Sequence, residues 1–241
     1  MKIVLTSILT LLLFTLGSPA FALDFNIQEQ AQFDQIAREA GTFITYRALA
    51  PAEPGGLTGF DISVAVSAVK VDSDLWDLVT PNDSVSSDYF YVPSIRVRKG
   101  LPFGIDVGAS YAQVPGEDIK AIGGEVQWAL LEGSVATPAL ALRGHYSTLL
   151  GVDDIDLTTY GADAVISKGF AIFTPYAGIG AVHMNGDYTN PLLPGVDFNE
   201  YDDTSMRYFG GLRMTLALLQ VTADVEYLEN PVYSLKVGLG W

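Results

Sequence analysis

The sequence contains no cysteine, only two histidines, and 13 basic residues against 28 acidic ones. Without cysteine, neither a disulfide framework nor a thiolate metal site or nucleophile can form. Two histidines are too few for a histidine-rich metal site, so we expect no metal and no cofactor. The formal net charge of −15 argues against nucleic acid as a partner, because binding of phosphates needs clustered lysine and arginine.

Long apolar runs are also missing, except for one at the amino terminus. Lys2 precedes an apolar core from Ile3 to Leu16, and residues 20–22 form a small-x-small sequence. These parts are typical of a secretory signal peptide over residues 1–22, cleaved at its last residue. A transmembrane anchor is the alternative, but this core is short for the ~20 residues that span a bilayer. The next residue is Leu23 instead of cysteine, which excludes a lipoprotein, and the mature chain contains no candidate membrane helix.

Beyond residue 56, apolar and polar residues alternate in stretches of roughly ten residues that are broken by turns. In "FDISVAVSAV", residues 60–69, the large apolar side chains share one face, and aspartate and serine share the other. This period of two predicts strands whose two faces meet different surroundings. The predicted strands are 57–70, 89–99, 103–114, 119–131, 136–149, 156–167, 170–185, 204–217, 219–228 and 232–241.

The connections between these strands are of two kinds. Four are tight, with the sequences "KGLPF", "LEGS", "SKGF" and "ALLQ", whereas 71–88 and 186–203 are long. The connections opposite the tight turns carry many aspartates and glutamates and no lysine or arginine. Tight turns on one side and acidic loops on the other are expected of an up-and-down transmembrane barrel. The predicted fold is therefore an all-β, antiparallel β-barrel of ten strands, with twelve or eight strands as alternatives.

Aromatic residues mark both ends of the predicted strands on the apolar face. Such rings favour the two rims of the apolar band of a membrane, because one edge of the ring stays hydrated. The predicted aromatic girdle consists of Tyr91, Phe103, Tyr111, Trp128, Tyr146, Tyr160, Phe170, Tyr208 and Tyr227.

The last strand ends the chain on an aromatic residue and has a large apolar residue at every second position. It resembles the signal that the barrel-assembly machinery reads in bacterial outer-membrane β-barrel proteins, carried here by Tyr233, Leu235, Val237, Leu239 and Trp241. Residues 57–241 resemble this class as a whole, and "KGLPFGIDVGASY" is similar to uncharacterised outer-membrane barrel families. The resemblance implies a monomer in the outer membrane of a Gram-negative bacterium, after cleavage of the signal peptide, with membrane lipid and lipopolysaccharide as partners.

Residues 23–56 form a different region, partly helical and partly extended. Apolar residues recur at helical spacing within 26–41, and Gly41 closes the pattern, which predicts a helix there. We expect this region to be solvated or to lie at the membrane interface. A plug inside the barrel is the alternative, and two further strands here would give the twelve-stranded barrel.

The polar faces of the predicted strands collect acidic and basic residues in equal number, and these faces point into the barrel. Charges in so narrow a space are expected to pair, because an unpaired buried charge is strongly destabilising. A narrow, water-filled conduit lined by the same groups is the alternative. The predicted luminal charges are Asp61, Arg96, Arg98, Asp106, Glu125, Arg143, Asp163, Arg207, Arg213, Asp224, Glu226 and Lys236.

One pair of residues raises the possibility of an enzyme. His145 and Ser147 resemble the His-x-Ser motif of outer-membrane lipid A deacylases, in which histidine is the base and serine the nucleophile. Strand parity turns both residues into the lumen, away from a substrate in the lipid, so neither is assigned as catalytic. The preferred function is a structural barrel or a narrow passive conduit for small solutes. An enzyme that modifies lipid A or cleaves peptides, and a surface-loop binding or adhesion protein, are the alternatives.

Overall fold

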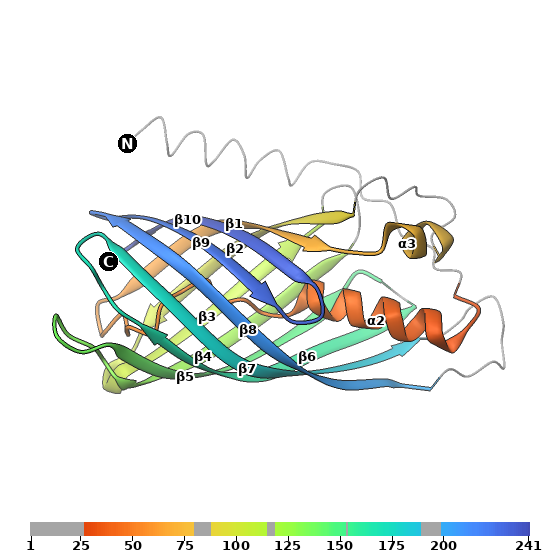
Figure 1. Ribbon diagram of the computed structural model, residues 1–241, viewed down its shortest axis with the longest axis horizontal. Coiled ribbons are helices and arrows are strands. Elements are labelled where there is room, and N and C mark those ends of the chain that lie inside the picture. Colours follow the sequence, from red (N-terminus) through yellow and green to blue (C-terminus); the bar gives the residue numbers. More distant parts are fainter. Residues whose placement is uncertain (1–26, 80–87, 115–118, 153, 189–198) are drawn as a thin grey trace.

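The computed structural model describes residues 27–79, 88–114, 119–152, 154–188 and 199–241. Ten antiparallel strands close into a barrel in which each strand pairs with its neighbours in the sequence and β1 pairs with β10 (Figure 1). The strands are β1 (Phe60–Lys70), β2 (Tyr89–Gly100), β3 (Ile105–Gln113), β4 (Lys120–Leu131), β5 (Ala139–Leu150), β6 (Ile155–Ser167), β7 (Phe173–Tyr188), β8 (Tyr201–Leu216), β9 (Leu219–Tyr227) and β10 (Pro231–Gly240).

The predicted fold class and the ten predicted strands are confirmed, with ends that differ by only a few residues. The alternatives of twelve and eight strands are wrong. The barrel closes where Phe60 and Trp241 exchange two backbone hydrogen bonds of 3.1 Å. The predicted signal peptide, residues 1–22, and the acidic loop residues Asp83, Glu117, Asp118, Asp153 and Asp197 lie outside the described residues.

Side chains alternate along the strands between the interior and an apolar exterior, and the interior is polar except near the loop-end termini of the strands. In β1, Asp61 and Ser63 are buried in the lumen while Ile62 and Val66 are exposed on the outside. Leu235 and Leu239 in β10 are also exposed. An apolar exterior around a closed ladder of hydrogen bonds is the arrangement that lipid requires, so the fold is that of a transmembrane β-barrel. The exposed aromatic residues include Tyr91, Phe103, Tyr111, Trp128, Tyr146, Tyr160, Phe170, Tyr208, Tyr227, Tyr233 and Trp241.

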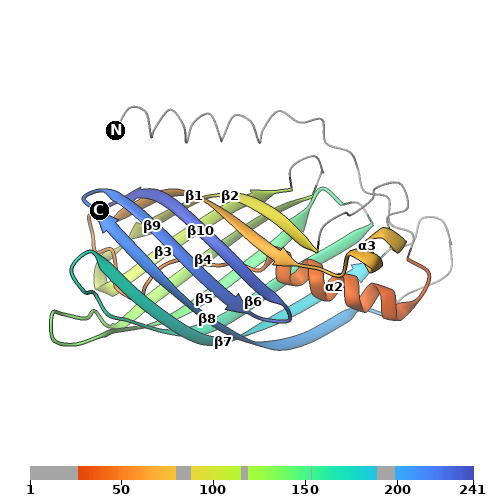
Figure 2. The ribbon, with the colours of Figure 1, turned by 45° about the horizontal axis from the view of Figure 1, so that its top comes forward.

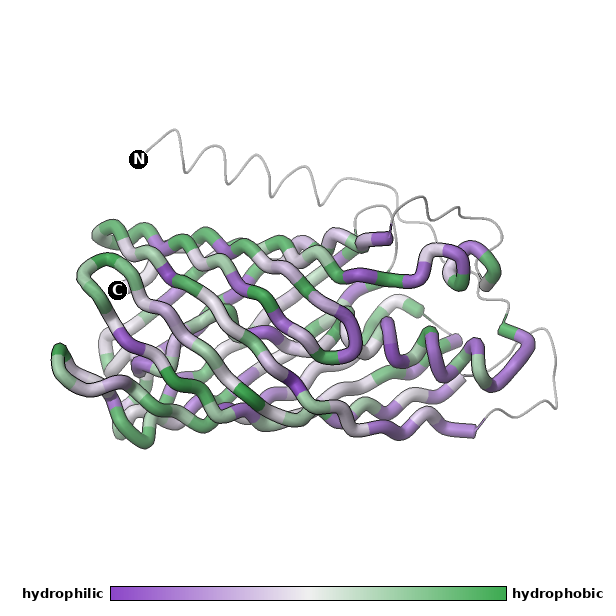
Figure 3. Tube along the Cα trace, viewed as in Figure 1, coloured by the Kyte–Doolittle hydropathy of each residue, from purple (hydrophilic) through white to green (hydrophobic). Residues whose placement is uncertain are grey.

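The two ends of the barrel differ in their connections. The end that carries the short connections 101–104, 132–138, 168–172 and 217–218, together with the closure at Phe60 and Trp241, is called here the turn end. The opposite end, called the loop end, carries the connections after β1, β3, β5, β7 and β9. In Figure 3, hydrophobic (green) stretches run along the barrel toward the turn end, and hydrophilic (purple) stretches gather at the loop end.

The N-terminal region enters the barrel. Helix α2 (Gln30–Ile44) lies at the loop end beside α3 (Ser73–Val79), opposite the C-terminus, in both Figure 1 and Figure 2. Buried residues of α2, including Phe33 and Ile36, pack against inward-facing apolar residues near the loop-end termini of the strands, such as Leu157 and Val182. A short 3-10 turn, Pro102–Gly104, lies at the other end.

The expectation that this region is solvated or interfacial is wrong, and the alternative of a luminal plug describes it. The side chains at positions 45–52 are all buried, and the apolar face of α2 is buried with them. The reason is that the part of the lumen near the loop end is apolar, so it can bury the apolar face of α2 as a membrane interface would. No described helix is both long and apolar enough to span a bilayer.

Candidate functional site

The plug, residues 45–52, is the extended stretch that follows α2 down the lumen. Every residue in it is buried, and three of its positions, Ala48, Ala50 and Ala52, carry only a methyl group. Small side chains let the plug backbone approach the wall, where large charged side chains already fill much of the space. The plug therefore fits a lumen that is too narrow for a second bulky segment.

Arg47 is the only charged residue of the plug and connects it to the upper wall. Its Nε forms an ion pair with Oε1 of Glu226 on β9 at 3.0 Å. Its Nη1 donates to the carbonyl oxygens of Phe43 and Thr45 at 3.4 and 3.2 Å, which ties it to the last turn of α2. Its own carbonyl oxygen accepts a hydrogen bond from Arg96 on β2. One arginine thus joins α2, the plug and two wall strands.

The lower part of the plug is hydrogen-bonded to the wall through its backbone. Arg143 on β5 donates to the carbonyl oxygen of Ala50 at 3.1 Å, and Gln127 on β4 donates to that of Ala52 at 3.1 Å. The backbone N–H of Ala52 donates to Oγ of Ser167 on β6 at 3.0 Å. The wall side chains therefore satisfy backbone groups that would otherwise be buried without partners, a state that is energetically costly.

Two glycines on the inner face make room for Tyr46. A Cβ atom at Gly108 on β3 would lie 2.8 Å from Tyr46 Oη, and one at Gly123 on β4 would lie 2.9 Å from Tyr46 Cδ2. The guanidinium carbon of Arg96 lies over the Tyr46 ring, 4.8 Å from its centroid. Tyr46 therefore packs between the guanidinium of Arg96 and the backbone at two glycines. A larger residue in place of either glycine would leave no room for the Tyr46 side chain.

The sequence-predicted luminal charges lie in the lumen, and most of them form ion pairs between adjacent or next-adjacent strands. Arg98 pairs with Asp106 at 3.0 Å and with Glu125 at 3.1 Å, and Glu125 also pairs with Arg143 at 3.2 Å. A second group joins Arg207 to Glu226 at 2.6 Å and to Asp163 at 3.2 Å, while Lys236 pairs with Asp61 at 3.2 Å. Asp224 accepts a hydrogen bond from Tyr176 Oη at 2.6 Å, and Arg213 has a buried Nε.

A small cavity lies beside the plug. The cavity between Tyr46, Arg47 and the inner faces of β1 to β4 measures about 30 Å³. A water molecule needs roughly 10–15 Å³ measured in this way, so this space accommodates about two. This cavity is too small to hold a hydrated ion unless the plug moves.

His145 and Ser147 both face the lumen but have separate partners. His145 Nε2 lies 3.2 Å from Arg207 Nη1 and 3.7 Å from Asp163 Oδ2, within the second ion-pair group. Ser147 Oγ shares a hydrogen bond of 2.9 Å with Oγ1 of Thr159 on β6. A nucleophile is activated by a hydrogen bond to its base, and here the serine is bonded to a threonine instead.

Replacement of Ser147 therefore tests a structural role against a catalytic one. Ser147→Ala is expected to leave the lipid A acylation pattern of the cell unchanged and to lower the free energy of unfolding by about 1 kcal/mol, through loss of one hydrogen bond. Mass spectrometry of lipid A and denaturant titration of the purified barrel measure the two effects. An acyl chain lost with the native serine and retained with alanine would contradict this expectation.

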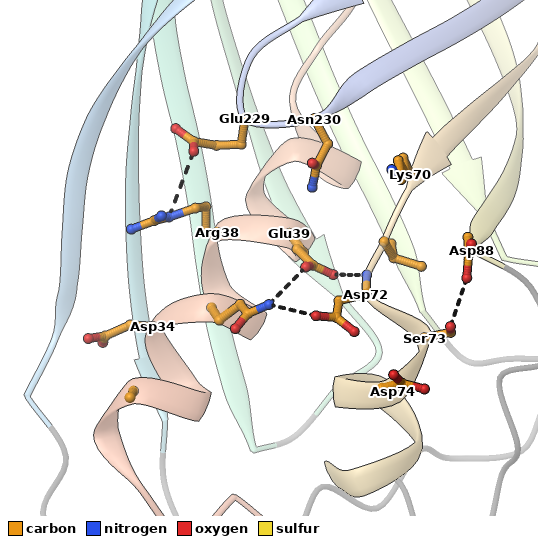
Figure 4. Close-up of a pocket in the computed structure, with 13 residues that line it drawn as sticks. Asp34, Arg38, Glu39, Lys70, Asp72, Ser73, Asp74, Asp88, Glu229 and Asn230 are labelled. Atoms are coloured by element: carbon orange, nitrogen blue, oxygen red, sulfur yellow. Dashed lines mark hydrogen bonds and ion pairs between the residues drawn. The ribbon is translucent and has the colours of Figure 1, made fainter.

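A polar groove opens at the loop end above the plug, between α2, α3, β1 and the connection from β9 to β10 (Figure 4). Its volume is about 760 Å³, and carboxylates outnumber cations in its lining. An excess of carboxylates raises the local concentration of cations near the mouth. Its labelled residues are Asp34, Arg38, Glu39, Lys70, Asp72, Ser73, Asp74, Asp88, Glu229 and Asn230.

Glu39 of α2 connects this helix to α3 by hydrogen bonds at the wall of the groove. Its Oε2 accepts hydrogen bonds from Trp76 Nε1 at 2.7 Å and from the backbone N–H of Asp72 at 3.1 Å. Trp76 is buried, and its ring lies edge-on to Phe90 with centroids 5.0 Å apart. The two helices therefore form one cap over the loop-end mouth.

Sequence reasoning missed the residues that hold the plug. Tyr46, Arg47 and Gln127 were not singled out, and neither was Glu39. The signal for them is present in "ITYRALAPAEPGG", where one arginine stands among small and apolar residues just before a Pro/Gly break. Such a stretch fits a narrow, buried path better than an exposed linker, which usually carries more polar residues.

The chain matches known proteins only among solved structures. No protein-family model matches it, and no curated protein matches it. Among solved structures, it is similar to Ail, the attachment invasion locus protein of Yersinia pestis, at 16% identity over 76% of this chain and 96% of that one, with a TM-score of 0.34.

Two further matches are of the same kind. The N-terminal barrel domain of Pseudomonas aeruginosa OprF matches at 13% identity over 77% of this chain and 99% of that one, with a TM-score of 0.33. LpxR from Salmonella typhimurium matches at 8% identity over 76% and 99%, with a TM-score of 0.39. All three are outer-membrane β-barrel proteins, and overlaps this low assign no role to the chain.

Proposed function

We propose that the protein is a structural barrel of the outer membrane that is closed by its own N-terminal region and has no enzymatic activity. The observation that carries this proposal is the bonding of the plug to the wall: Arg47, Ala50 and Ala52 bond to side chains on five strands, β2, β4, β5, β6 and β9. A segment held in this way is part of the core of the barrel. A passive conduit would need this core to move.

The exterior of the barrel supports the proposed location and partners. The apolar, aromatic-rimmed outside suits outer-membrane lipid, and the acidic loop end suits contact with lipopolysaccharide through shared divalent cations. The terminal strand that ends at Trp241 is the segment that we propose the barrel-assembly machinery recognises during insertion. Residues 1–22 are removed on export, and the barrel acts as a monomer.

Electrical recording tests the closed state directly. The purified barrel, added to planar lipid bilayers, is expected to give a flat current trace at moderate voltages of either sign. The reason is that the space beside Tyr46 accommodates only about two water molecules. Stable, ion-conducting steps from the wild-type protein at low voltage would contradict the closed barrel and favour a passive conduit.

A further inference from the structure

The direction in which the N-terminal region passes through the barrel assigns a compartment to the amino terminus. Residue 60 begins β1 at the turn end, next to Trp241. Just before it, the backbone N–H of Gly55 donates to Asp106 Oδ1 at 3.0 Å, and Lys99 Nζ donates to the carbonyl oxygen of Leu57 at 2.7 Å. Both contacts are at the turn end of the barrel, because Asp106 is the second residue of β3 and Lys99 the penultimate residue of β2.

Going backwards along the chain, each contact lies closer to the loop end. Above the plug, Phe33 of α2 stacks on Tyr188, the last residue of β7, with ring centroids 5.7 Å apart. The side chain of Gln30 exchanges hydrogen bonds of 2.9 and 3.1 Å with the backbone of Asn199, two residues before β8 begins. The chain therefore enters the barrel at the loop end and leaves it at the turn end.

In a transmembrane barrel the short turns face the periplasm and the longer loops face the outside of the cell. We infer that the mature protein presents its amino terminus on the external surface, having carried its first segment across the membrane inside its own barrel. This inference rests on the outer-membrane location and the signal-peptide cleavage proposed above.

The length of chain ahead of the barrel supports the same placement. With the proposed cleavage behind residue 22, only residues 23–26 precede Ile27, which is buried at the loop end. Four extended residues reach at most ~14 Å. A ten-residue strand such as β10 rises ~33 Å and, tilted by ~40°, spans ~25 Å of membrane. The amino terminus cannot return to the turn side around the barrel, and the plug occupies the way through it.

The absence of cysteine makes the test simple, because any cysteine introduced is the only one. Three full-length single variants are compared: Gln28→Cys, at the entry of the segment; Leu78→Cys, 61% exposed on α3 at the loop end; and Val135→Cys, fully exposed in a tight turn. Intact cells are treated with a membrane-impermeant maleimide–polyethylene glycol, and each variant is then scored by its gel shift. A parallel sample is treated after permeabilisation.

The expected result is a one-label shift for Gln28→Cys and Leu78→Cys in intact cells, and a shift for Val135→Cys only after permeabilisation. If Leu78→Cys is labelled in intact cells while Gln28→Cys behaves like Val135→Cys, the external amino terminus is overturned and the outer-membrane barrel stands. If Val135→Cys alone is labelled in intact cells, or if no variant is, the orientation or the location fails, and the inference fails with it.

Discussion

Displacement of the plug is expected to convert a silent barrel into a conducting one. In Gly123→Val, a branched side chain is placed where a Cβ atom alone would lie 2.9 Å from both Tyr46 Cδ2 and Ser147 Cβ. Valine has a high propensity for β-strands, so the barrel should still form while the Tyr46 side chain is displaced from its packing position against the wall. Discrete current steps in planar bilayers are expected from this variant and from a second one that lacks residues 27–52.

Gly144→Val on β5 is the matched control, because a Cβ atom at Gly144 would meet no atom within 4 Å. It makes the same chemical change at an exposed strand position and should stay as silent as the wild type. Circular dichroism and gel mobility before and after heating verify that each barrel is folded. If the two plug variants fold and remain silent, the ion pairs of the wall are sufficient to seal the lumen without the plug.

Replacement of Arg207 is expected to produce the largest loss of stability by a point substitution. Its guanidinium pairs with Glu226 at 2.6 Å and with Asp163 at 3.2 Å, and all three side chains are almost completely buried. Removing one partner leaves buried charge without compensation, which typically costs about 3–5 kcal/mol. Arg207→Ala should therefore lower the free energy of unfolding by about that amount in a denaturant titration of the barrel in lipid or detergent.

Arg38→Ala provides the comparison at the loop end. Arg38 forms an ion pair with Glu229 at 3.9 Å, but 47% of its side chain is exposed. Solvent-exposed pairs contribute about 0–1 kcal/mol, so this variant should unfold almost like the wild type. Arg207→Lys is expected to fall between the two, since it keeps the charge but loses the planar fork that reaches two carboxylates. Equal losses for Arg38→Ala and Arg207→Ala would contradict a role for burial.

The strands were predictable because one physical contrast, lipid outside and polar groups inside, is repeated along each of them. Ile62 and Asp61 show this contrast, which continues along the strands except near their loop-end termini, where inward-facing residues such as Leu157 are apolar. The placement of α2 was not predictable in the same way. Its apolar face, with Phe33 and Ile36, suits a membrane interface as well as the upper lumen, so periodicity alone cannot choose between them.

For the candidate site, parity could state which charges point inwards but not which of them meet. Arg98 pairs with Glu125 because β2, β3 and β4 are in a particular register, and register follows from turn geometry and packing across the barrel. Arg47 escaped notice for another reason: it lies on neither a strand nor a helix, so no periodic pattern marked its direction. The strands of the barrel wall could be predicted from the sequence, but the position of the plug inside the barrel and its contacts could not.

The seam between β1 and β10 constrains the order in which this molecule is assembled. A cylinder of hydrogen bonds has no lateral gap, and only residues 53–59 separate the plug from β1. To place the plug afterwards, the apolar helix α2 would have to be drawn through a passage lined with ion pairs. The simpler order of assembly is that the sheet closes around a plug that already lies against its concave face. The first and last strands then pair only after the plug is in place.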